Sequence, residues 1–182
     1  MLPFLQGRGS TRKLRLFACA IAGRRPDLLD QMGVWDTLAL AERWAEGLVP
    51  DDEMDAELGL AGVPLPPWPR SVAAASQWFA QAGVDAEQAE RKRQAHAALL
   101  RCLFGNPFRP VVVDPAWLAH ADGVVAKVAE SNYQRRAFDE LPLLADALTD
   151  CGCVDEQMLS HCRGPGPHAR GCFVVDALTG RG

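Results

Sequence analysis

Between its prolines and glycines the chain repeats one pattern, in which apolar residues recur every three or four positions. In residues 12–22 this apolar stripe consists of Leu14, Phe17, Ala18 and Ile21. Patterns of the same period predict further helices over residues 34–46, 51–58, 71–81, 85–103, 122–136, 141–149, 155–162 and 172–178, and a helical turn over 115–118. Only the valine triplet at residues 111–113 is typical of a strand. We therefore predict an all-α fold with at most one or two short strands.

A proline-rich stretch divides the sequence. Residues 59–70 contain the run GVPLPPWP, in which so many prolines exclude both a helix and a central strand. We expect a linker or an extended loop there, between an N-terminal helical part (residues 1–58) and a C-terminal helical part (residues 71–182). A chain of 182 residues can bury a sizeable core. We therefore expect the two parts to fold as one cooperative domain.

Charge is distributed unevenly along the chain. The formal net charge is −4, yet residues 1–25 carry +6 and the remainder carries −10. The acidic total argues against nucleic-acid binding across the whole surface. The basic end could bind an acidic partner or a phosphate, or it could pair with acidic residues of its own fold. Nucleic-acid or phosphate binding through the basic N-terminal helix is therefore kept as a weaker alternative.

Nothing in the sequence predicts a membrane span or an export signal. No apolar run reaches the length of about 18 residues that a span needs. Residues 14–23 resemble a signal peptide, but Arg15 interrupts them and no small-residue cleavage site follows. We therefore expect a cytoplasmic protein with no membrane partner, whose six cysteines are reduced thiols or metal ligands rather than disulfides.

Cysteine and histidine gather near the C-terminus. Four of the six cysteines and two of the four histidines fall within residues 151–172, around a loop stiffened by two prolines. Zinc takes about four nitrogen or sulfur ligands, and the favoured set is Cys153, His161, His168 and Cys172, with Cys151 as a substitute for Cys153. The spacings match no strong zinc signature. The cysteines, like Cys19 and Cys102 elsewhere, could equally be core residues, and the histidines could cap helix carbonyls.

Two other interpretations of the same segment stay open. Cys172 at a helix start, with His168 as base and Asp176 as orienting residue, would form the site of a cysteine-dependent enzyme. Alternatively, Arg163 and Arg170 in the glycine-rich loop could bind an anion or a partner's acidic segment, together with Arg109. The arginines could instead have a purely structural role, in which they pair with Asp146, Asp150 or Asp176 and hold the loop in place.

Several motifs carry a resemblance to a known family. They are FGNPFRP at residues 104–110, DPAWL at 114–118, LPLLADAL at 141–148 and HCRGPGPHARGCFVVD at 161–176, with RKLRLFACA at 12–20 and AERWAEG at 41–47. Together they resemble an uncharacterised bacterial domain family, often present in many copies in large genomes. The resemblance covers nearly the whole chain except residues 48–85 and implies no activity. Members commonly begin further upstream, which indicates a truncated or alternative start here, and Phe173 stands where a tryptophan is usual.

These observations lead to one prediction of fold and function. We expect a single multi-helix domain with a Cys/His-rich, loop-braced C-terminal subdomain. Its function would be that of a non-enzymatic protein-interaction module, with Zn²⁺ as the candidate stabilising ion and the loop and its arginines facing a protein partner.

Overall fold

Helices make up all the regular secondary structure that the computed structural model describes, in residues 10–60 and 86–181. The all-α prediction is thereby confirmed for these ranges. The strand-like triplet at residues 111–113 forms no strand and is an irregular segment with no described strand beside it. Val111 and Val113 pack against the core while Val112 is 78% exposed, so the strand-like pattern reflects alternate burial of an unpaired chain. The predicted linker at 59–70 and helix at 71–81 lie outside the described residues.

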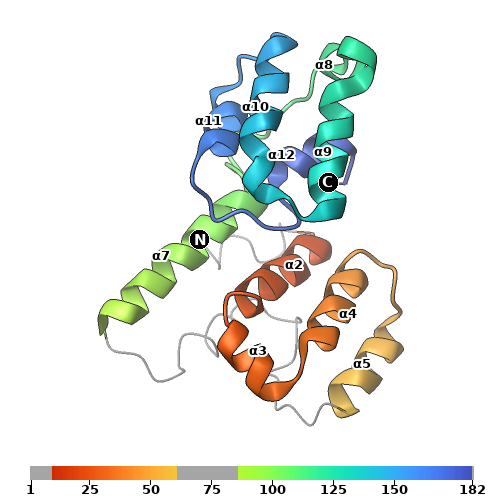
Figure 1. Ribbon diagram of the computed structural model, residues 1–182, viewed down its shortest axis with the longest axis vertical. Coiled ribbons are helices and arrows are strands. Elements are labelled where there is room, and N and C mark those ends of the chain that lie inside the picture. The colour runs from red at the N-terminus through yellow and green to blue at the C-terminus, as the bar shows by residue number, and fades with distance from the viewer. Residues whose placement is uncertain (1–9, 61–85, 182) are drawn as a thin grey trace. The chain divides into compact units, whose positions relative to one another are not determined.

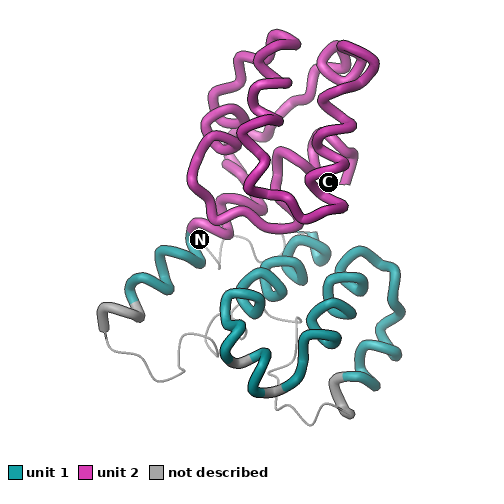
Figure 2. The backbone as a smooth tube through the Cα atoms, viewed as in Figure 1, with its two compact units in different colours: residues 1–97 teal, residues 98–182 magenta. Residues whose placement is uncertain are grey.

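The chain divides into two compact units, coloured separately in Figure 2. Unit 1 comprises residues 1–97 and unit 2 comprises residues 98–182. The boundary falls within helix α7 (Ala86–Phe104), whose first part belongs to unit 1 and whose last part belongs to unit 2. This division differs from the one expected at the proline-rich stretch.

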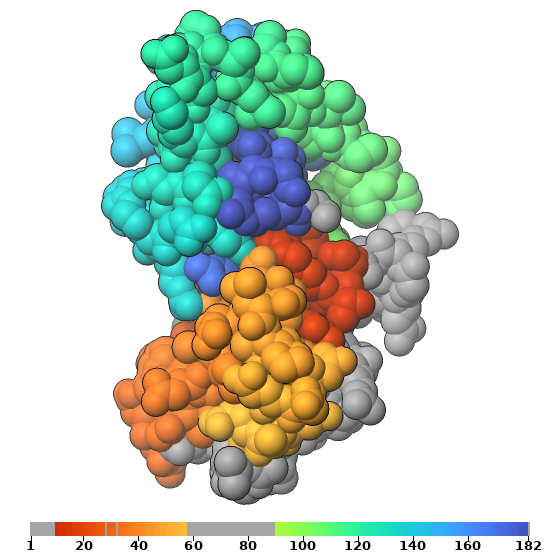
Figure 3. All heavy atoms as spheres, turned by 90° about the vertical axis from the view of Figure 1, so that its right-hand side faces the viewer, coloured from red at the N-terminus to blue at the C-terminus, as the bar shows by residue number. Residues whose placement is uncertain are grey.

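Unit 1 is built on a pair of packed helices. Its N-terminal elements are α2 (Thr11–Ala22), α3 (Pro26–Met32), α4 (Trp35–Ala45) and α5 (Asp51–Leu60). Helix α2 packs on α4, and α4 packs on α5, as Figures 1 and 3 both show. Phe17 and Ile21 of α2 are almost completely buried, as are Ala41 of α4 and Met54 of α5. The apolar stripe predicted for residues 12–22 is therefore the core face of α2.

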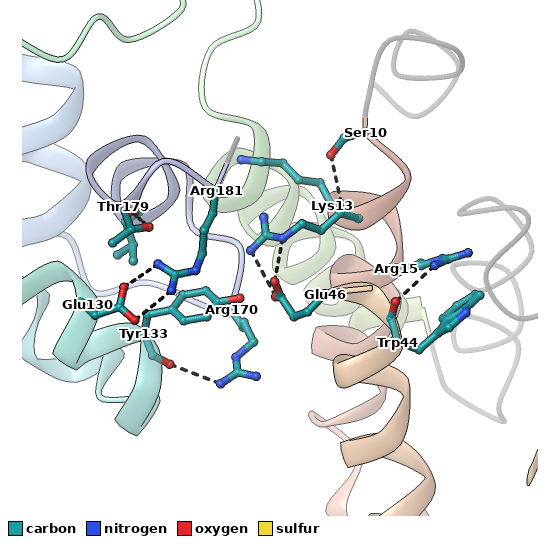
Figure 4. A network of polar contacts seen from close by, with 12 residues as sticks. Ser10, Lys13, Arg15, Trp44, Glu46, Glu130, Tyr133, Arg170, Thr179 and Arg181 are labelled. Atoms are coloured by element: carbon teal, nitrogen blue, oxygen red, sulfur yellow. Dashed lines mark hydrogen bonds and ion pairs between the residues drawn. The ribbon is translucent and has the colours of Figure 1, made fainter. Parts of the chain in front are cut away.

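The basic start of unit 1 pairs with acidic residues of the same unit (Figure 4). Arg12 Nε donates to Glu46 at 3.0 Å. Arg15 forms an ion pair with Asp51 at 3.3 Å, and its guanidinium lies 3.2 Å from the centre of the Trp44 ring. Arg25 likewise pairs with Asp27 at 2.8 Å. At least three of the six early cations thus pair with acidic residues of their own unit, which was one of the alternatives left open.

Unit 2 packs short helices around an aliphatic core. Its elements after α7 are α8 (Pro115–Ala119), α9 (Val124–Arg135), α10 (Leu141–Asp150), α11 (Glu156–Arg163) and α12 (Phe173–Thr179), with 3₁₀ turns at His120–Gly123 and Phe138–Glu140. Helix α10 packs on α11, and α12 packs on α9 (Figure 1). Leu141, Leu144 and Leu148 are completely buried from α10, and Val174 and Val175 from α12. Four of the buried residues of this core are cysteines, namely Cys102, Cys153, Cys162 and Cys172.

None of the described helices is both long enough and apolar enough to cross a membrane.

Candidate metal centre in unit 2

Three ligand-bearing side chains converge inside unit 2 from separate helices, and a fourth, His168, lies beside them. Cys102 lies on the last turn of α7, where Leu99 and Leu103 share its buried face. His161 lies on the last turn of α11, and Cys172 is the N-cap residue of α12. His168 lies on the loop that joins these two helices. The other three lie at helix ends, where side chains can converge without distortion of a helix.

The distances between these side chains are short. Cys172 Sγ lies 3.3 Å from His161 Nε2, and Cys102 Sγ lies 4.0 Å from His168 Nδ1. One ligand atom from each of Cys102, His161 and Cys172 lies within 4.8 Å of the other two. The imidazole rings of His161 and His168 meet edge to face, with their centres 4.8 Å apart. Cys102, His161 and Cys172 therefore surround a common point, and His168 lies beside them in contact with Cys102 and with the His161 ring.

This arrangement fits the dimensions of a zinc site. In tetrahedral coordination with Zn–S near 2.3 Å and Zn–N near 2.0–2.1 Å, a sulfur and a nitrogen ligand atom are about 3.5 to 3.6 Å apart. The two observed sulfur–nitrogen distances, 3.3 and 4.0 Å, lie on either side of that range. Two thiols and two imidazoles also form one of the common structural zinc sets.

His168 is oriented by the backbone in the way a metal ligand requires. Its Nε2 lies 3.2 Å from the carbonyl oxygen of Gly164. Because a carbonyl can only accept, Nε2 carries the proton, and Nδ1 of the neutral ring keeps its lone pair toward Cys102. Burial lowers the pKa of His168, with His161 adding to the effect, so the ring is held neutral.

The environment of Cys172 favours its thiolate. Burial by itself would raise the pKa of this thiol, but interactions with Cys102 and His161 lower the pKa well below its ordinary value. A thiolate is the form that binds metal. The side chain is completely buried. A negative sulfur with no access to solvent needs a cation close to it, since an unpaired buried charge is costly.

The two neighbouring cysteines behave differently. Burial raises the pKa of Cys162 and of Cys153, so both remain thiols within the core. Neither belongs to the group of closely spaced ligand atoms among the described residues. From the predicted set the structure brings His161 and Cys172 into this group, with Cys102 in place of Cys153. His168 lies outside the group but contacts Cys102 and His161. Cys102 had been interpreted as a core residue because it lies beside the apolar stripe of a predicted helix. Its position two residues before the FGNPFRP motif is the only sequence signal that pointed to it.

The arginines of the loop form hydrogen bonds that hold neighbouring elements together. Arg163 donates to Thr149 Oγ1 at 3.0 Å and to Asp146 Oδ1 at 3.4 Å, which ties α11 to α10. Arg170 donates to the carbonyl oxygen of Tyr133 and lies 4.8 Å from the centre of its ring (Figure 4). These contacts correspond to the structural interpretation rather than to an open anion site. Arg109 is different, because its side chain is exposed.

The geometry also bears on the cysteine-dependent enzyme. The imidazole beside Cys172 is that of His161, whereas the proposed base, His168, has its Nδ1 toward Cys102. Asp176 is 1% exposed, within the core of unit 2. A nucleophile must reach its substrate, and the complete burial of Cys172 leaves it no such access. The arrangement is therefore suited to hold an ion and poorly suited to attack a substrate.

The chain was compared with protein-family models, curated protein sequences and solved structures. None of the three comparisons found a match.

Proposed function

We propose that unit 2 is a zinc-stabilised, non-enzymatic module that binds another protein. The observation that carries the proposal is the convergence of Cys102, His161 and Cys172 inside the core. In the proposed site His168, whose Nδ1 lies 4.0 Å from Cys102 Sγ, is the fourth ligand. Four protein ligands leave no open position for a substrate or a water, which is the mark of a structural rather than a catalytic zinc site. Both cysteines are completely buried, which agrees with this role.

An exposed apolar surface on unit 2 supports the binding role. Phe108 is 80% exposed, Val112 78% and Val154 85%. The loop that carries Phe108, Arg109 and Val112 is joined to α11 by a hydrogen bond from Gln157 Nε2 to the Arg109 carbonyl oxygen at 3.4 Å. Val154 lies just before α11, so these residues belong to two adjoining segments. Exposed apolar side chains with an arginine among them are typical of protein-binding surfaces.

Metal analysis of paired cysteine variants tests the zinc site. The wild-type chain, purified without chelator, is expected to contain about one equivalent of zinc, because a closed four-ligand site holds its ion tightly. Cys102→Ala is expected to lose most of it. Cys153→Ala removes an equally buried thiol of the same core and is expected to keep it. Equal zinc contents in the two variants, or no zinc in the wild type, would contradict the site.

Site-specific photo-crosslinking tests the binding role. A photoreactive amino acid at position 108 is expected to give a discrete protein adduct in an extract of the source cells. The same group at Leu48, a 67% exposed residue of unit 1, serves as the control and should not give this adduct. Val154→Asp should abolish the adduct, because it places a charge in the same apolar surface. Identical products from both positions would argue against a specific surface on unit 2.

We also propose that the chain belongs to the bacterial family whose motifs it resembles. The motif HCRGPGPHARGC supplies three of the four candidate ligands, His161, His168 and Cys172. In that family the motif would then be the zinc-binding loop.

A further inference from the structure

Unit 1 contains a basic cavity that has no part in the proposed zinc module. The cavity has a volume of about 220 Å³ and lies between the end of α2 and the first part of α7. Four permanent cations line it, and no carboxylate is among its described lining residues. The cations are Arg24, Arg25, Arg91 and Lys92, and the rest of the described lining is Ile21, Ala95 and His96. Such a concentration of one sign of charge in a concave site attracts anions.

Lys92 gives the strongest indication of a ligand. Its Nζ is shielded from solvent and has no hydrogen-bond partner in the described part of the chain. A buried ammonium group without a partner is costly, and native proteins rarely keep one without a reason. An anion in the cavity would supply the missing acceptor.

The pKa of His96 reflects burial and the positive charges around the cavity. Burial lowers its pKa, and the charges of Arg24 and Lys92 lower it further. The ring also meets Phe17 of α2 edge to face, with their centres 6.4 Å apart, which fixes α7 against α2 at this point. Among the lining cations, Arg25 has its own counter-ion in Asp27, at 2.8 Å. Lys92 has no such counter-ion among the described residues, so its charge is available to a ligand.

We propose that this cavity binds the terminal phosphate or diphosphate group of a small molecule. Guanidinium and ammonium groups together are the usual ligands of phosphate oxygens in proteins. One water occupies about 30 Å³ in the liquid, so a cavity of about 220 Å³ has room for more than a single phosphate group. A terminal phosphate carries up to two charges and can enter a recess, whereas a phosphodiester in a nucleic-acid backbone carries one and lies along a surface. The recess therefore favours a small molecule over nucleic acid.

Calorimetric titration of the whole chain with inorganic pyrophosphate tests the proposal. The wild type is expected to bind one pyrophosphate. Lys92→Met, which keeps the aliphatic stem, is expected to weaken binding by about tenfold or more, as expected for loss of a charged hydrogen bond. Arg93→Met removes the same charge from the next residue of α7, whose side chain is 69% exposed and paired with Glu90. It should change the affinity by about twofold or less, as expected for an exposed ion pair.

Other results of this titration would contradict the proposal. No binding would remove the site, and equal weakening by both variants would show diffuse attraction to surface charge. A single-stranded oligonucleotide without terminal phosphate that binds more tightly and displaces pyrophosphate would show nucleic acid to be the source of the phosphate. Folding can be checked independently, because Lys92→Met removes an unpartnered buried ammonium and should raise the melting temperature. A lower melting temperature would mean that Lys92 already has a structural partner and serves no ligand.

Discussion

Gly166 is the residue on which the position of His168 depends most directly. Its φ is +83°, and a Cβ at this position would lie 2.9 Å from His168 N and 3.2 Å from His168 Cδ2. Any larger residue would therefore push against both the backbone and the ring of a candidate zinc ligand. Gly152 has nearly the same φ, +85°, but a Cβ there would meet nothing within 4 Å. The two glycines separate the cost of backbone strain from the cost of displacing His168.

We therefore predict different outcomes for the same substitution at the two positions. Gly166→Ala and Gly152→Ala should each lower the free energy of unfolding by about 1–2 kcal/mol, because alanine is strained at positive φ. Only Gly166→Ala should also weaken zinc binding, measured by competition with a chromophoric chelator, since it moves His168 away from Cys102. If the two variants hold zinc equally well, His168 is not a ligand.

Some residues of the candidate site could be predicted from the sequence, and others could not. His161, His168 and Cys172 were identified because they lie close together along the chain. Cys102 was not, because its approach to His168 depends on how α7 packs in unit 2, which local patterns do not specify. Cys153 lies nearer in sequence, yet burial within the core keeps it a neutral thiol. Proximity in sequence was therefore a good guide to the loop and a poor guide to the fourth ligand.

Most helices could be predicted to within one or two residues because their ends depend on local chemistry. Asp155, for example, accepts from the backbone N–H groups of Gln157 and Met158, so that α11 begins at Glu156, one residue after the predicted start. Helix α3 was missed, because Pro26 was taken only as the end of the preceding helix. In the structure Gly23 ends α2, and Pro26 begins α3, as proline can at a first helical position.

The last helix depends on its neighbours more than on its own length. Helix α12 has seven residues, which is too short to be stable alone. At its start, Cys172 lies in the candidate zinc site. Beyond its end, Arg181 forms a bidentate ion pair with Glu130 of α9, at 2.6 and 2.9 Å, and lies 4.3 Å from the centre of the Tyr133 ring (Figure 4). The helix is thus fixed at both ends by side chains from other elements. The zinc site would then stabilise α12 as well as the loop before it.

For the whole molecule, the two proposed sites belong to different units. The candidate zinc ligands all lie in unit 2, and the residues that line the basic cavity all lie in unit 1. Removal of zinc should therefore act on one unit, while pyrophosphate should act on the other. Hydrogen exchange resolved by peptide can distinguish these effects, because it reports the opening of each helix separately.

We predict that chelation of zinc will loosen unit 2 and leave the helices of unit 1 protected. A ligand present at a hundred times its dissociation constant stabilises the state that binds it by about 2.7 kcal/mol. Loss of a zinc ion held at least this tightly should therefore speed amide exchange in α10, α11 and α12 by about 100-fold or more. Exchange in α2 and α4 should change little, and added zinc should restore the protection in unit 2. Cys102→Ala should show the fast exchange without any chelator. Equal acceleration in both units, or none in α12, would mean that no ion stabilises this core.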